Sequence, residues 1–121
     1  MGKEYASDLS QRLLKFSVET IKLVGKIKGS RELDVVRYQL SKSATSIGAN
    51  FEESRCTTKN EFPAKIRISV REALETAYWF RLIRALNVTN HTDIELLLAE
   101  NIEIIKILKS ILRKTSIPSI L

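Results

Sequence analysis

The sequence predicts an all-α protein, an antiparallel up-down-up-down four-helix bundle that forms one domain over residues 1–121. Three observations favour this fold class. Apolar residues recur at helical spacing in four long segments, the connections between these segments are short, and only four glycines and two prolines interrupt the 121 residues. Alternation of apolar and polar residues, which would predict a strand, does not occur.

The first helix is predicted over about residues 7–27, with Ser7 as its N-cap. Its inward row follows steps of four and three: Leu9, Leu13, Phe16, Thr20, Leu23 and Ile27. A second apolar row lies beside it and makes the stripe wide enough for additional neighbours: Leu14, Val18, Ile21 and Val24. The far side carries a charged stripe: Arg12, Lys15, Glu19, Lys22 and Lys26.

The second helix is predicted over about residues 31–55, after a tight connection in which Gly29 ends one helix and Ser30 caps the next. Its inward row is Leu33, Val36, Leu40, Ala44, Ile47 and Phe51. The many hydroxyl side chains and Gly48 lower its intrinsic helix propensity. Because Ser41, Ala44 and Gly48 form a stripe of small residues, we expect close packing on more than one side of this helix.

The third helix is predicted over about residues 61–86, with Pro63 in its first turn. The core face is Ile66, Val70, Ala73, Ala77 and Phe80. A second face mixes acids with large apolar groups, which is typical of a buried polar contact or a subunit interface: Ile68, Glu72, Glu75, Trp79, Leu82 and Ile83. A third face interleaves cations with an aromatic ring: Arg67, Arg71, Leu74, Tyr78 and Arg81.

The fourth helix is predicted over about residues 92–114, opened by a capping box of Thr92 and Glu95. Its apolar face is Ile94, Leu97, Leu98, Ile102, Ile105, Leu108 and Leu112. Acids in its first half and bases in its last half complement the helix dipole and allow pairs such as Glu103 with Lys106. We expect the apolar tail, residues 117–121, to fold back on the bundle or to dock on a neighbouring subunit.

Composition and charge narrow the functional classes. Net charge is +6, which favours polyanions, and the basic excess falls in residues 1–30 and 57–90. Cys56 is alone, so neither an intrachain disulfide nor a cysteine metal cluster can form, as expected in a reducing compartment. With no signal core and no run long enough to cross a membrane, we predict a cytoplasmic protein without a membrane partner.

Catalytic chemistry finds little support. No catalytic residue, metal or cofactor is predicted, because the single histidine, His91, lies in a loop and glycine-rich phosphate loops are missing. Glu53, Glu72 and Glu75 are expected to pair with Lys65, Arg67 or Arg71, or to accept hydrogen bonds from Ser43, Ser46 and Asn50. Cys56 is interpreted as a small, partly buried filler.

Two basic surfaces are the candidate binding sites. Cations contact phosphates and an aromatic ring stacks on bases, so these faces suit a nucleic acid, although solvation or subunit salt bridges explain them equally simply. The nucleic-acid-binding candidates are Arg12, Lys15, Lys22, Lys26, Arg67, Arg71, Tyr78 and Arg81.

Several segments resemble one family. Four segments are similar to bacterial four-helix bundle proteins encoded in intervening sequences of 23S ribosomal RNA genes, often labelled ribosomal-protein-like. The segments are Arg12 to Ser17, Gln39 to Glu53 with its Ser-Ile-Gly-Ala-Asn run, Phe62 with Lys65, and Arg71 to Trp79. The chain is also similar to the accessory protein of diversity-generating retroelements, which works with RNA and a reverse transcriptase.

The resemblance implies a homopentameric ring with a basic surface and no enzymatic activity. It implies an RNA-associated protein whose partners are copies of itself and structured RNA, with a protein-interaction scaffold or adaptor ring as the alternative. No catalytic residues carry over. The matched positions are expected to form a structural and interface signature: Gln39, Ser43, Ser46, Gly48, Asn50, Glu53, Glu72, Glu75 and Trp79.

Overall fold

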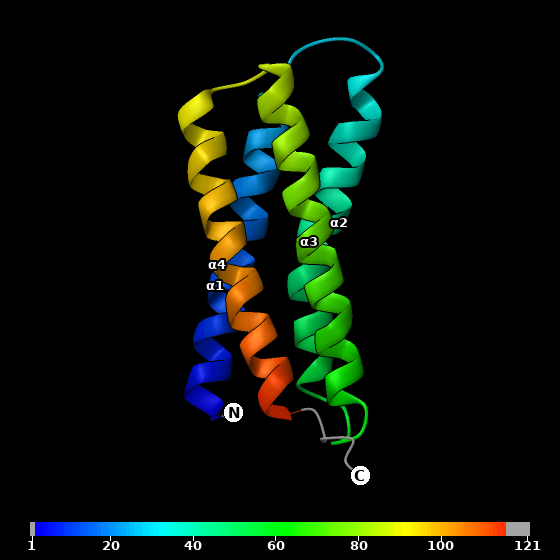
Figure 1. Ribbon diagram of the computed structural model, residues 1–121, viewed down its shortest axis with the longest axis vertical. Coiled ribbons are helices and arrows are strands. Elements are labelled where there is room, and N and C mark those ends of the chain that lie inside the picture. The colour runs from blue at the N-terminus through cyan, green and yellow to red at the C-terminus, as the bar shows by residue number, and fades with distance from the viewer. Residues whose placement is uncertain (1, 116–121) are drawn as a thin grey trace.

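The computed structural model describes residues 2–115, which form four α-helices in the order predicted. The helices are α1 (Lys3–Val24), α2 (Leu33–Ser54), α3 (Phe62–Leu86) and α4 (His91–Thr115). They run alternately up and down in one bundle (Figure 1), and residues 2–115 contain no strand. The predicted all-α four-helix fold is confirmed, whereas the apolar tail at 117–121 lies outside the described residues.

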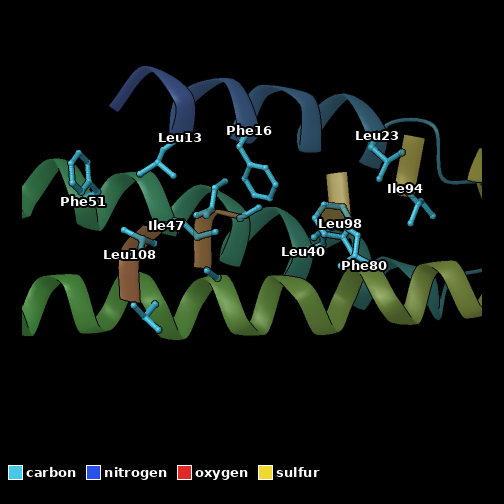
Figure 2. Packing of buried hydrophobic residues seen from close by; sticks show 14 of the residues in the cluster. Leu13, Phe16, Leu23, Leu40, Ile47, Phe51, Phe80, Ile94, Leu98 and Leu108 are labelled. Atoms are coloured by element: carbon cyan, nitrogen blue, oxygen red, sulfur yellow. The ribbon is translucent and has the colours of Figure 1, made fainter. Parts of the chain in front are cut away.

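The core contains the inward rows that the apolar spacing predicted for the first two helices, and every residue of both rows is buried. Figure 2 shows Leu13, Phe16 and Leu23 of α1 among side chains of the other helices. The rings of Phe16 and Phe80 meet edge to face, with centroids 6.1 Å apart. Such aromatic contacts add to the stabilisation from apolar burial.

Gly48 lies where α2 packs closely against α1. A Cβ atom at this position would lie 3.4 Å from Leu13 Cβ on α1, at the short end of van der Waals contact. The small-residue stripe therefore admits α1, as predicted from its composition.

Buried hydroxyl groups join α2 to α3 on the other side. Ser43 and Thr76 are almost fully buried, and their hydroxyl oxygens lie 2.9 Å apart. Ser69 is also buried and donates to the Ile47 carbonyl oxygen at 2.9 Å. The second helix is thus packed tightly on two sides, which confirms the expectation from its sequence.

The first connection differs from the prediction. The first helix begins at Lys3 and ends at Val24, so Ser7 lies inside it as an exposed residue and does not cap it. Gly25 follows the helix end, and α2 starts only at Leu33, without a side-chain cap from Ser30. Residues 25–32 form a longer turn, and it needs glycine at position 29, where φ is +134°.

The fourth helix also starts differently. The prediction of a capping box at Thr92 and Glu95 is wrong, because the helix already begins at His91. The Asn90 side-chain oxygen accepts the Asp93 N–H instead, at 3.0 Å. An acceptor three residues before that N–H is the geometry of an N-cap. The predicted ends at residues 55, 86 and 114 differ by no more than one residue from the observed ends at Ser54, Leu86 and Thr115.

The inward face of α4 is rotated relative to the prediction. Ile102 is 44% exposed, so its inward assignment is wrong, and the neighbouring Asn101 is fully buried. Asn101 was overlooked because it is polar, but its amide donates to the Ala73 carbonyl oxygen at 3.0 Å. Ile104 and Ile111 complete the buried face that this rotation produces.

Candidate nucleic-acid interface

The outer face of α3 presents a row of cations with an aromatic ring. Its members follow one another at steps of four and three, so they share one stripe of the helix: Arg67, Arg71, Leu74, Tyr78 and Arg81. All five are exposed. Among residues 2–115, none of the three arginines forms an ion pair with an acid, so their guanidinium groups are available to an external anion. We call this row the α3 arginine face.

The Tyr78 ring is oriented by its neighbour. Its centroid lies 5.1 Å from that of Trp79, with the rings nearly perpendicular at 75°. The side chain remains 54% exposed. An aromatic ring that is held by a neighbour and more than half exposed can stack on a nucleobase.

The charged stripe on α1 is used differently. Arg12 donates two hydrogen bonds to the Glu100 carboxylate, at 2.7 and 2.8 Å, and these bonds raise the pKa of Arg12. Lys26 lies 3.8 Å from the Asp93 carboxylate. Of the four α1 cations predicted to contact phosphate, Arg12 and Lys26 are therefore paired with acids of α4. Lys15 and Lys22 form no ion pair within residues 2–115.

Of the signature residues on α2, Ser43 and Glu53 contact α3, whereas Gly48 faces Leu13 of α1. Lys65 at the start of α3 donates to Glu53 at 2.7 Å, which confirms one predicted pairing. Trp79 is half-buried, and its indole N–H donates to Glu75 at 3.0 Å. Burial raises the pKa of Glu72, and the negative charge of Glu75 raises it further.

The predicted hydrogen bonds from serine and asparagine to these acids are wrong. Asn50 donates to the Ser46 carbonyl oxygen of its own helix at 2.9 Å, and Ser43 meets Thr76 instead. Short polar side chains in a helix reach the carbonyl one turn back more easily than a neighbouring helix. Thr76 was missed as part of this contact, although its spacing from Ala73 and Phe80 places it on the core face.

The remaining candidates for chemistry stay isolated. Cys56 is exposed, so its interpretation as a partly buried filler is wrong. Among residues 2–115, no three His, Cys, Asp or Glu side chains gather closely enough to hold a metal ion. None of the four helices is sufficiently long and apolar to span a bilayer.

Comparison with known proteins decides the family. The family model described as 23S rRNA-intervening sequence protein matches residues 6–110. The chain belongs to this family. The resemblance read from the Gln39–Glu53 and Arg71–Trp79 segments is thereby confirmed.

A solved structure of the same architecture is similar to this intervening-sequence protein. It is the crystal structure of a protein with unknown function from the S23 ribosomal protein family of Bacteroides thetaiotaomicron VPI-5482. Sequence identity is 30%, the match covers 86% of this chain and 97% of the other, and the TM-score is 0.79. No curated protein matches the chain.

Proposed function

We propose that this protein is a non-enzymatic, RNA-associated homo-oligomer of the bacterial cytoplasm whose α3 arginine face contacts phosphates. The observation that carries the proposal is the absence, within residues 2–115, of any ion pair to Arg67, Arg71 or Arg81, which share one exposed stripe with Tyr78. The family description names the intervening sequence of 23S rRNA, and ribonucleic acid is therefore the polyanion that we propose.

The geometry of the row suits a nucleic-acid strand. From Arg67 to Arg81 the helix rises about 21 Å, at 1.5 Å for each residue. Three cations along that length can contact separate phosphates, and each contact releases counterions. Oligomerisation would repeat the row on every subunit and raise the overall affinity.

The test is binding of a fluorescent RNA hairpin by wild type and by the Arg67→Ala/Arg71→Ala variant over a range of salt concentrations. We expect the variant to bind about tenfold more weakly, with the slope of log K against log salt reduced by about 2, near 1 for each lost phosphate contact. Arg113→Ala/Lys114→Ala is the matched control, because it removes two exposed charges from α4 and should have a much smaller effect. Equal losses for the two variants, or no binding at low salt, would refute the proposal.

Self-association is the second part of the proposal, with a pentameric ring as the expected assembly. Its support is a row of exposed apolar side chains on α1, where Leu14, Val18 and Ile21 are 58%, 43% and 46% exposed. A second mixed surface lies on the α2–α3 side, where Trp79 is half-buried. Two different surfaces on one protomer favour head-to-tail contacts, and these form a ring when the rotation between neighbouring subunits closes.

Light scattering after size exclusion measures this directly. Wild type at micromolar concentration should have a mass several times the 13.8 kDa of the chain, and Val18→Glu should shift it toward the monomer. A wild-type mass of one chain would refute self-association. Should RNA binding fail while the oligomer persists, the alternative of a scaffold that recruits a partner protein is favoured.

A further inference from the structure

An open groove lies between α1 and α4, and the proposed RNA contact does not involve it. The two helices lie side by side (Figure 1), and the groove between them has a volume of about 880 Å³. Phe16 and Leu23 of α1 and Leu97 of α4 line it. Leu96 also lines it and is 66% exposed, the highest value among the large apolar side chains of residues 2–115. We call it the α1–α4 groove.

The charges around this groove are distributed unevenly. Ion pairs link Arg12 to Glu100 and Lys26 to Asp93, so both acids contributed by α4 are already neutralised. Lys15 and Lys22 line the α1 wall and form no ion pair within residues 2–115. They stand seven residues apart, so about 10 Å separates them along the helix. Glu19, between them in the sequence, is the remaining acid of the groove.

A bare polyanion is a poor match for such a surface. RNA would cover Leu96 and Leu97 with a polar backbone and would meet the carboxylate of Glu19. An amphipathic α-helix places apolar side chains on a leucine-lined floor and keeps charged ones at the edge of the stripe. Acids spaced by two turns on that edge would reach Lys15 and Lys22.

We propose that the α1–α4 groove binds an amphipathic α-helix of a partner protein, with acidic residues along the side that faces Lys15 and Lys22. The length available, from Arg12 to Lys26, corresponds to about 14 helical residues or four turns. The bound helix would pack as a fifth helix against the bundle. This binding does not depend on the α3 arginine face and stands whether or not that face contacts RNA.

The test uses three labelled peptides of about 14 residues, each held helical by a side-chain lactam. One carries leucines at three- and four-residue steps with glutamates seven residues apart on one flank, the second has lysines in place of those glutamates, and the third is a scramble of the first. Anisotropy titrations should show the glutamate peptide binding at least tenfold more tightly than either of the others.

Charge reversal makes the test specific. Lys15→Glu/Lys22→Glu should weaken the glutamate peptide at least tenfold and should prefer the lysine peptide, whereas Lys109→Glu/Lys114→Glu, on exposed positions of α4, should leave the preference unchanged. Leu96→Ser should weaken both charged peptides. The inference is overturned if the scramble binds as well as the designed sequence, or if the Lys15/Lys22 variant loses RNA hairpin binding without any change in peptide preference.

Discussion

Replacement of Gly48 measures how strongly the close approach of α1 and α2 constrains the sequence. In a helix interior, glycine to alanine contributes about 1 kcal/mol of stability through backbone propensity. The new Cβ would lie 3.4 Å from Leu13 Cβ, slightly inside the most favourable separation of about 3.5–4.0 Å, which offsets a few tenths of a kcal/mol. We expect Gly48→Ala to raise the free energy of unfolding by about 0.5 kcal/mol.

Valine at the same position should have the opposite effect. Its two γ-methyl groups extend beyond a Cβ position that already lies 3.4 Å from Leu13 Cβ, and the single preferred rotamer in a helix limits how they can turn away. Overpacking of this kind costs about 1–3 kcal/mol. Gly48→Val should therefore be about 2 kcal/mol less stable than Gly48→Ala, as measured by urea denaturation with a fixed m-value.

Ala49, the exposed neighbour on α2, supplies the control. Ala49→Gly and Ala49→Val report propensity alone, and the valine change there should cost no more than about 0.7 kcal/mol. If Gly48→Val proves as stable as Gly48→Ala, Leu13 moves aside without cost and the argument from close approach fails.

Three further perturbations test the packing and the charges. Thr20 is fully buried, and its hydroxyl has no hydrogen-bond partner within residues 2–115. Thr20→Val should therefore raise the free energy of unfolding by about 1 kcal/mol. A loss of stability in thermal and urea melts would contradict this expectation. Phe80→Ala removes the ring that meets Phe16 and should cost about 3–5 kcal/mol in the same melts, whereas a cost below about 1 kcal/mol would show that the core collapses around the gap. The pKa of Glu72 in the folded state is raised by burial and by Glu75, so its contribution to stability is present below the ordinary glutamate pKa of 4.5 and is lost as pH rises through the raised value. Glu72→Gln should therefore raise the melting temperature at neutral pH, with a difference from wild type that vanishes in acid, and an equal difference at both pH values would exclude titration as its cause.

The apolar spacing alone predicts the four helices, their order and most of the buried rows. Helical period is a local property, and a row such as Leu9, Leu13 and Phe16 must face the interior wherever the helix packs. Helix starts were less predictable, because Asn90 and Thr92 are both good caps and only the path of the preceding loop selects between them.

Which polar groups meet depends on how the helices pack against one another. Arg12 and Glu100 are separated by 88 residues, and no spacing pattern relates them. The register and rotation of α4 against α1 bring them together, and the same rotation buries Asn101 and exposes Ile102. As a result the α1 stripe, which interleaves cations along one helix as the α3 arginine face does, is partly neutralised and lines a groove. In contrast, Arg67, Arg71 and Arg81 of the α3 arginine face form no ion pair within residues 2–115, although Arg84 of the same helix pairs with Glu95. Charge pairing depends on the relative placement of whole helices, which the apolar period of each helix does not specify.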